Sequence, residues 1–158
     1  MIDTMTDPRF AAVVEYFRRV DAGDPSVVDL MTDEVQVYFP KFGTRRGKSA
    51  VGELAQGIMR SVSSIAHDFE RMTILAAGHH VIVEGFESGL AKDGTPWPDP
   101  MFSEGRFCNV FEFQGPLIKR LHIYVDPDFS SRDKGRFLWG GNVRLAAPGT
   151  SGALDAGS

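Results

Sequence analysis

The spacing of hydrophobic residues changes near residue 64, and this change constrains the fold more than any other feature of the chain. Before it, apolar residues recur three or four positions apart, which is typical of helices with one buried face. After it, apolar and polar residues alternate, and β-branched and aromatic residues are frequent, which is typical of strands. Helices followed by strands predict an α+β fold, in which three N-terminal helices pack on a curved, mostly antiparallel sheet.

Three helices and a short strand are predicted in the first part of the chain. The first helix covers about residues 7–22 and ends before Gly23, a residue common just beyond helix C-termini. A short second helix follows, and the alternating segment EVQVYF then forms a strand. The third helix covers residues 48–61, where apolar residues again lie on one face.

Four long strands are predicted in the second part. They correspond to the segments HDFERMTILAA, HHVIVEGFESGLA, RFCNVFEF and LIKRLHIYVD. Turns that contain glycine separate them, so neighbouring strands should pair antiparallel. We expect a single domain over residues 1–145. The tail over residues 146–158 is small, polar and without an apolar period, and we expect it to be disordered.

Composition argues against several classes of function. The net charge is −4 and basic residues cluster only in pairs, so we expect no binding to nucleic acid. Cys108 is the single cysteine and no histidines have metal-site spacing, so we predict no disulfide, no metal and no organic cofactor. No apolar run approaches the roughly 20 residues that cross a bilayer, and no secretory signal is present. We therefore expect a cytoplasmic protein that does not contact membranes.

The order of these segments resembles a known family. The corner AGD, the strand TDEVQVYFP and the closing strands FCNVFEFQG and IKRLHIYVDP are similar to the nuclear transport factor 2-like superfamily, in its SnoaL-like polyketide cyclase and ketosteroid isomerase branch. The resemblance covers about residues 8–127. It implies a cone-shaped α+β barrel with a pocket between the helices and the concave face of the sheet. It also implies a homodimer formed through the convex face.

Strand alternation indicates which side chains enter such a pocket, because every second residue points to the same face. We expect Glu84 to point inward between two apolar neighbours. A desolvated carboxyl has a raised pKa, so Glu84 is the candidate acid–base group. The alternative is an ion pair on the outer face. Asn109 is expected inward among aromatic residues, either as a donor to a developing oxyanion or as a buried amide that the backbone satisfies.

Tyr16 is the third catalytic candidate. It lies seven residues before Gly23, and the resemblance implies that ketosteroid isomerases place a hydrogen-bonding tyrosine at this spacing. The alternative is an aromatic residue of the core. The candidate residues for the walls of the pocket are Tyr38, Phe39, Ile82, Phe86, Trp97, Phe107, Phe111, Leu121 and Ile123. Trp97 lies in a loop over residues 91–105 that suits either a lid or a contact with a second subunit.

The chain departs from the enzymes that it resembles. Phe39 occupies the position of the ketosteroid isomerase general base, so classical isomerisation is not expected. The chain also lacks the acid and arginine residues of the limonene epoxide hydrolase-like branch. Their inward positions hold Asn109, Phe107 and Ile123, and the shifted alternatives are Glu104, Arg106 and Asp126. His67 opens the first long strand next to Asp68, and we expect an ordinary surface residue at a strand edge. The alternative is an acid–base role, since an imidazole titrates in the useful pH range.

These observations predict an acid–base enzyme that needs no cofactor. It would be a cyclase, isomerase or dehydratase that acts on a hydrophobic, carbonyl-containing substrate of polyketide or terpenoid type. Two alternatives stay open, namely a non-catalytic module that binds a hydrophobic ligand or dimerises, and an epoxide hydrolase. The binding alternative gains if Glu84 points to the convex face and the cavity holds no other titratable group.

Overall fold

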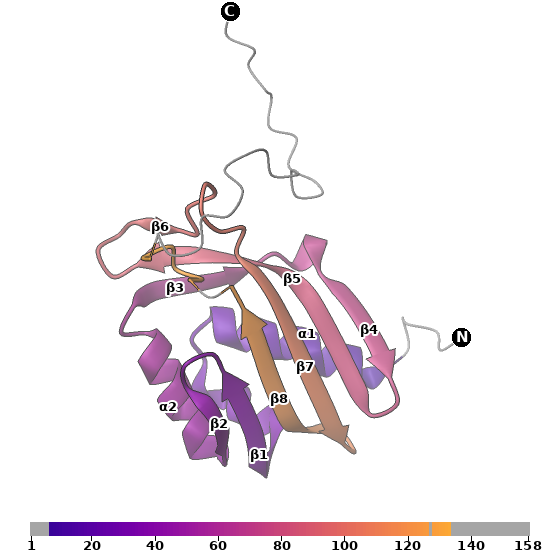
Figure 1. Cartoon of the computed structure of the whole chain (residues 1–158). Helices are drawn as coiled ribbons and strands as arrows, with labels where there is room; N and C mark the ends of the chain where they lie inside the picture. Colours follow the sequence, from indigo (N-terminus) through magenta and orange to yellow (C-terminus); the bar gives the residue numbers. More distant parts are fainter. Residues whose placement is uncertain (1–6, 127, 134–158) are drawn as a thin grey trace, which may run out of the picture.

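The structure is a computed structural model that describes residues 7–126 and 128–133 (Figure 1). Its helical segments are α1 (Pro8–Asp21), the 3-10 helix η1 (Pro25–Leu30), α2 (Lys48–Ile58) and the 3-10 helix η2 (Phe69–Arg71). Its strands are β1 (Met31–Phe39), β2 (Gly43–Arg46), β3 (Val62–His67), β4 (Thr73–Ala77), β5 (His80–Ala91), β6 (Pro96–Trp97), β7 (Arg106–Gln114) and β8 (Leu117–Val125). The expected α+β class, with helices packed on a curled mixed sheet, is confirmed.

The strands form one mixed sheet. Neighbouring strands follow the order β2-β1-β8-β7-β5-β3, while β4 and β6 also pair with β5. Strands β1 and β8 are parallel, and the other pairs are antiparallel. The first half of β5 pairs with β4 and β7, and its second half pairs with β3 and β6. Because β5 joins both groups of strands, the sheet curls around the helices (Figure 1).

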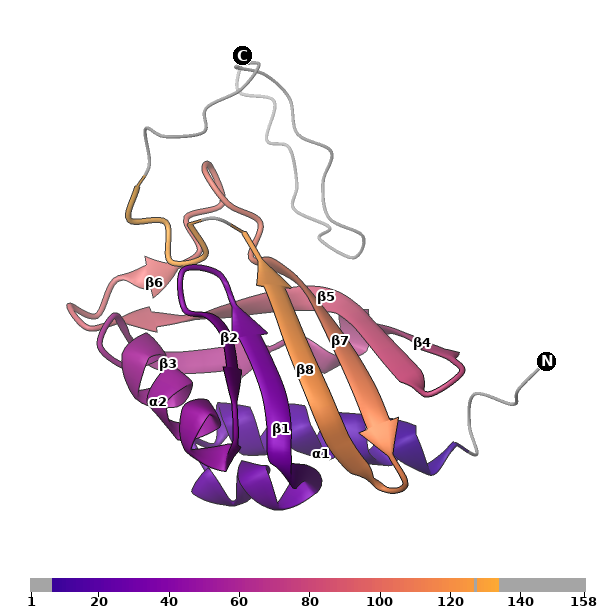
Figure 2. The same cartoon turned by 60° about the horizontal axis from the view of Figure 1, so that its bottom comes forward.

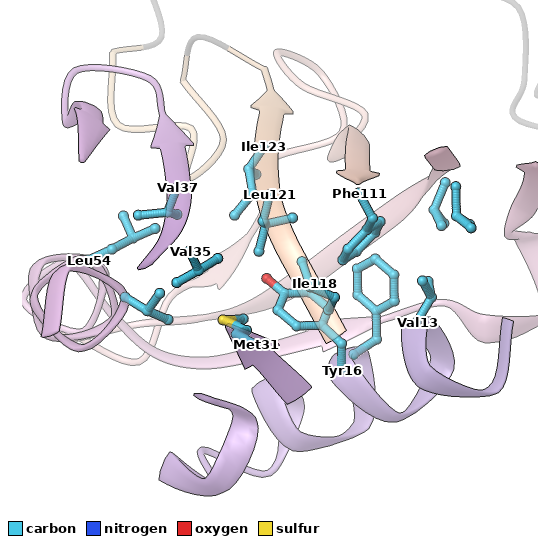
Figure 3. Packing of buried hydrophobic residues seen from close by; sticks show 14 of the residues in the cluster. Val13, Tyr16, Met31, Val35, Val37, Leu54, Phe111, Ile118, Leu121 and Ile123 are labelled. Carbon is cyan, nitrogen blue, oxygen red and sulfur yellow. The ribbon is translucent and has the colours of Figure 1, made fainter. Parts of the chain in front are cut away.

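Both long helices lie against the same face of this sheet (Figure 2). The side chain of Asp7 accepts a hydrogen bond from the backbone of Arg9 at 2.9 Å, which caps the start of α1. The residues of α1 that are fully buried are Val13, Tyr16 and Phe17. They lie three and one positions apart, on one side of the helix, and belong to the same core cluster as residues of β7 and β8. Figure 3 shows Val13 and Tyr16 pointing toward these strands.

The predicted strand HDFERMTILAA is interrupted in the structure. His67 ends β3, and the carboxylate of Asp68 then accepts hydrogen bonds from the backbone of Glu70 and Arg71, which starts η2. Strand β4 begins only after this turn. The interruption moves His67 from the expected start of a strand to the end of one, where the chain leaves the sheet beside α1.

The alternation of β5 differs by one residue from the sequence prediction. The buried residues of its first half are Val81, Val83 and Gly85, so odd-numbered side chains face the helices. A Cβ atom at Gly85 would lie 2.9 Å from the ring of Phe107, so a larger residue would crowd the core here. Because strand faces alternate strictly, this register places Glu87 inside and Glu84 outside.

Two further expectations concern the ends of the chain and membranes. The tail predicted over residues 146–158 lies outside the described residues. Within the described part, no helix is both long and apolar enough to cross a membrane.

Candidate functional site

A cavity of about 50 Å³ lies between the helices and the curled sheet. It is lined by Tyr16, Val20, Phe39, Ile58, Ile65, His67, Glu87, Asn109, Ile123 and Phe129. Four of these side chains are polar and the other six are apolar. A cavity of this size with four polar side chains in its walls has room for a few water molecules or for the reacting end of a larger ligand.

His67 is fixed in the wall of this cavity by the last residue of α1. The Nδ1 atom of His67 lies 2.5 Å from Oδ1 of Asp21, and the backbone N–H of His67 donates to Oδ2 of Asp21 at 2.9 Å. The imidazole also packs between Phe17 and Phe107, with ring centroids at 4.7 and 5.0 Å. Its side chain is only 6% exposed. The tautomer that donates to Asp21 carries its proton on Nδ1 and leaves the lone pair on Nε2.

Asp21 occupies a position that does not favour a carboxylate by itself. It is the last residue of α1, and the C-terminus of a helix carries partial negative charge. Two hydrogen bonds from His67 compensate for this position. A carboxylate that orients an imidazole in this way holds both the tautomer and the ring direction.

Glu87 is the carboxyl group that enters the cavity. It is the cross-strand partner of His67, so both side chains lie on the same face of the sheet. Oε2 of Glu87 lies 3.5 Å from Nε2 of His67, and the carboxyl side chain is 10% exposed. Burial raises the pKa of Glu87 to about 8, and the negative charges of Asp126 and Asp21 contribute to this rise. At neutral pH, Glu87 is therefore mainly a protonated acid.

The loop before β7 approaches the backbone of Glu87 closely. The backbone N–H of Glu87 donates to the carbonyl of Gly105 at 2.8 Å. Gly105 has a φ of 67°, and a Cβ atom there would lie 2.2 Å from the carbonyl oxygen of Glu87. Only glycine allows this contact, which fixes the end of the loop against the acid.

Asn109 and Tyr16 are placed as the sequence predicted. Asn109 is 3% exposed, lies inward between aromatic residues of β7, and its Oδ1 atom has no hydrogen-bond partner among the described residues. Tyr16 is 6% exposed and packs edge-to-face on Phe111 with ring centroids at 5.2 Å. Burial, with the charges of Glu87 and Asp21, raises the pKa of Tyr16, so its hydroxyl stays protonated.

The inward orientation expected for Glu84 is wrong. Its side chain is 63% exposed on the outer face, where it lies 3.9 Å from Arg106. Both parities of β5 contain apolar residues, and the buried set is Val81, Val83 and Gly85 rather than the set that contains Glu84. The cavity nevertheless holds a buried carboxyl, because Glu87 has the inward parity.

The predicted walls divide into three groups. Phe39 and Ile123 line the cavity as expected. Phe107, Phe111 and Leu121 point inward but belong to the packed core rather than to the lining. The remaining four, Tyr38, Ile82, Phe86 and Trp97, lie elsewhere and correct the prediction.

Each of these four side chains has another environment. Tyr38 packs with His122 and Tyr124 on the outer face, and Ile82 shares the outward parity of Glu84. Phe86 is also on that face, and it is buried because the guanidinium groups of Arg71 and Arg106 lie over its ring at 4.3 and 4.7 Å.

Trp97 forms neither an exposed lid nor an exposed contact for a second subunit. It is 2% exposed and packs in a small cluster with Val62 and Ala91. Its ring also contacts Phe129, with centroids at 5.6 Å. Its loop contributes the short strand β6, which holds Trp97 against β5.

Phe129 follows the last strand, where the sequence allows it either across the mouth of the pocket or on a second subunit, and in the structure it covers one side of the cavity. Its ring packs edge-to-face on Phe39 at 5.9 Å between centroids. The segment that carries it is attached to the 91–105 loop, since the hydroxyl of Ser131 accepts a hydrogen bond from the backbone of Asp99 at 2.7 Å. Phe129 therefore limits the size of the cavity.

Replacing Phe129 by alanine is expected to lower the free energy of unfolding by about 2 kcal/mol, because it removes a half-buried ring and leaves a void. The same change should strengthen the binding of apolar probes that are too large for the closed cavity. Urea unfolding and probe titration measure the two effects. Phe69→Ala is the control, since Phe69 is 40% exposed on η2. Equal losses of stability in both variants would contradict the packing described here.

The acid and arginine set of an epoxide hydrolase does not assemble in the cavity. Arg106 forms an ion pair with Glu104, lies over Phe86 and is 42% exposed. Oδ2 of Asp126 accepts a hydrogen bond from Ser103 at 2.6 Å. No arginine is among the cavity-lining residues in the described part of the chain.

His67 is the residue whose position differs most from the sequence prediction. A surface position was favoured over an acid–base role, and the structure buries the side chain in the wall of the cavity. The signal in the sequence was weak, because Asp21 and His67 are 46 residues apart and belong to different elements. An aspartate at the very end of an amphipathic helix was the one local hint, since helix ends of this polarity disfavour it.

Comparison with known proteins identifies the fold. The family model of the SnoaL-like domain matches residues 13–121. A comparison with curated proteins found no match. An NTF2-like protein of unknown function from Burkholderia pseudomallei is similar in structure, with a TM-score of 0.67 and 16% identity, over 82% of this chain and 99% of that chain.

Two other similar structures are a ligand complex and a protein with an assigned activity. TerC co-crystallised with polyporic acid has a TM-score of 0.64 and 15% identity, over 76% of this chain and 92% of that chain. A protein of Xanthomonas campestris pv. campestris, provisionally assigned as a polyketide cyclase, has a TM-score of 0.62 and 16% identity, over 75% and 90%. At such identities the likeness shows the fold alone.

Proposed function

We propose that this chain, which belongs to the SnoaL-like domain family, is an enzyme that moves protons on a carbonyl-containing small molecule held in the cavity. The observation that carries the proposal is the pair of His67 and Glu87. An imidazole held by a carboxylate faces a protonated carboxylic acid in a cavity with mostly apolar walls. Such a pair supplies a base and an acid to the same ligand.

The proposed roles follow from the atoms that face the cavity. Nε2 of His67 takes a proton from the carbon next to the carbonyl. Glu87 and the hydroxyl of Tyr16 are hydrogen-bond donors for the carbonyl oxygen as negative charge develops on it. Asp21 keeps the proton of His67 on Nδ1 and stabilises the imidazolium that forms. Enolisation of this kind is the common first step of the cyclisations and isomerisations expected from the sequence.

The related structures add modest support. One solved structure of this fold is provisionally assigned as a polyketide cyclase, and another was crystallised with an organic acid. Both agree with a fold that accommodates small organic molecules. The homodimer implied by the resemblance stays a prediction. The outer face offers an aromatic cluster of Tyr38, His122 and Tyr124, and Tyr124 is 47% exposed.

A non-catalytic ligand-binding protein is the second candidate. Glu84 points to the outer face, which is one of the two conditions that would favour it. The other condition is not met, because His67 and Glu87 are titratable groups in the cavity. Acid–base chemistry is therefore the better proposal.

Deuterium exchange tests the proposal without knowledge of the natural substrate. A panel of small cyclic ketones is incubated with the protein in D₂O, and loss of the proton signals next to the carbonyl is followed by NMR. We expect the protein to accelerate exchange of at least one ketone over buffer. If no ketone of the panel exchanges faster with the protein, while some bind, the ligand-binding candidate is the better one.

A further inference from the structure

The charges and hydrogen-bonding groups around the cavity indicate the class of ligand. We propose that the ligand is uncharged and carries a hydroxyl group in addition to its carbonyl. This inference rests on the proposed function, since it describes the substrate of the same site. Two separate observations support it. Among the described residues, the cavity lining offers no partner for a charged ligand, and the amide oxygen of Asn109 has no hydrogen-bond partner.

An anionic ligand has no counter-charge in the cavity. Among the cavity-lining residues that the structure describes, none is a lysine or an arginine. The charges next to the cavity are the negative charges of Asp21 and Asp126. Asp21 is hydrogen-bonded to His67, and both carboxylates contribute to the raised pKa of Glu87. A carboxylate or phosphate would lose its hydration and meet like charge, which is costly in an apolar enclosure.

The carboxyl groups that would pair with a cationic ligand either have other hydrogen-bond partners or are protonated. Both carboxylate oxygens of Asp21 accept hydrogen bonds from His67. Oδ2 of Asp126 accepts from Ser103 at 2.6 Å. Glu87 is mainly protonated at neutral pH because burial raises its pKa to about 8. An uncharged ligand is therefore the one that the cavity accepts without an unpaired charge.

The side-chain oxygen of Asn109 needs a hydrogen-bond donor. Its Oδ1 atom is buried and has no hydrogen-bond partner in the described part of the chain. The cross-strand neighbours of Asn109 are Val83 and Ile123, whose side chains have no donor to offer. Buried polar groups are usually satisfied, so a lone acceptor that lines a cavity indicates that the ligand supplies the proton.

A hydroxyl group meets this requirement and a ketone oxygen does not. A hydroxyl can donate to Oδ1 of Asn109, whereas a carbonyl oxygen can only accept. The hydroxyl of Tyr16 and the protonated carboxyl of Glu87 are donors, and they suit the carbonyl oxygen of the same ligand. A hydroxy ketone, or its enol, uses both kinds of group at once.

Three matched probes test the inference, namely cyclopentanol, cyclopentanone and cyclopentanecarboxylate. Each is titrated into the protein at pH 7, and affinity is read from backbone NMR shifts of the cavity residues. We expect the alcohol to bind about tenfold more tightly than the ketone, because only the alcohol satisfies the buried amide oxygen. We expect the carboxylate to bind at least about tenfold more weakly than the ketone, because its charge is unpaired.

Asn109→Leu should remove the preference for the alcohol over the ketone. Gln114→Leu is the control, since it makes the same kind of change at an exposed position of β7. The ranking of probes in the unchanged protein is decisive by itself, so the test stands even if Asn109→Leu does not fold. Equal affinity for alcohol and ketone, or a carboxylate that binds as tightly as either, would overturn the inference.

The outcome is separate from that of the exchange assay, because these titrations measure binding without turnover. A protein that prefers the alcohol but exchanges no ketone would contradict the proposed catalysis and support the ligand class. A protein that exchanges ketones but binds the three probes equally would support the catalysis and overturn the ligand class.

Discussion

Replacing His67 by glutamine is expected to slow deuterium exchange of the accepted ketone by about a thousandfold. Glutamine can still donate a hydrogen bond to Asp21, but it has no lone pair basic enough to take a proton from carbon. The measurement is the exchange rate by NMR at saturating ketone. The large size of the effect follows from the loss of the only base that faces the cavity among the described residues.

His80→Gln is the matched control. His80 begins β5, and its side chain is 37% exposed at the far end of the same sheet. This variant should exchange ketones at the rate of the unchanged protein. If His67→Gln keeps that rate as well, His67 is not the base, and the role proposed for the Asp21–His67 pair fails.

Replacing Glu87 by glutamine is expected to change how stability depends on pH. The folded protein keeps the carboxyl protonated up to a pKa of about 8, whereas a carboxyl in the unfolded chain ionises near 4.5. Between these values only the unfolded chain releases the proton, so the folded state loses stability as pH rises. Below about pH 4.5 the two states bind the proton equally, and above about pH 8 the loss is complete.

The expected loss is about 3 kcal/mol between pH 5 and pH 8, measured relative to Glu87→Gln, which has no titrating group at this position. Urea unfolding at several pH values measures it. Glu84→Gln is the control on the same strand, and its curve should run parallel to that of the unchanged protein because Glu84 is exposed. Parallel curves for all three proteins would show that Glu87 is not desolvated.

Much of the fold could be predicted from the sequence, because its signals are local. The helical spacing of α1 and the alternation in β7 and β8 have single plausible interpretations. Asn109 is the one polar residue among the inward aromatic positions of β7, so its orientation followed directly. Tyr16 likewise lies on the buried side of a clear amphipathic helix.

The acid of the site was harder to predict, because β5 is partly covered on both faces. The odd-numbered residues Val81 and Val83 pack in the core, while Phe86 on the opposite face is buried under two guanidinium groups. Apolar residues therefore occur in both parities. A small residue, Gly85, falls within the inward set, and its lack of a side chain made that set look less apolar than it is.

The pairing of Asp21 with His67 depends on tertiary structure. The end of α1 must reach the end of β3 before the two side chains meet, and no local pattern reports that distance. For Phe129 the sequence allowed either the mouth of the cavity or a second subunit, and only the tertiary structure reveals its contact with Phe39. Contacts between such distant segments follow from how the sheet curls.

The claim on which the proposed chemistry depends is that a buried, protonated carboxylic acid faces His67. Its most direct test is a pH titration of the side-chain carboxyl carbons by ¹³C NMR, with Glu87→Gln used to assign the signal. The expected midpoint for Glu87 lies near pH 8. A midpoint near the ordinary value of 4.5 would mean that the carboxyl is solvated and ionised at neutral pH, which would contradict its role as the acid.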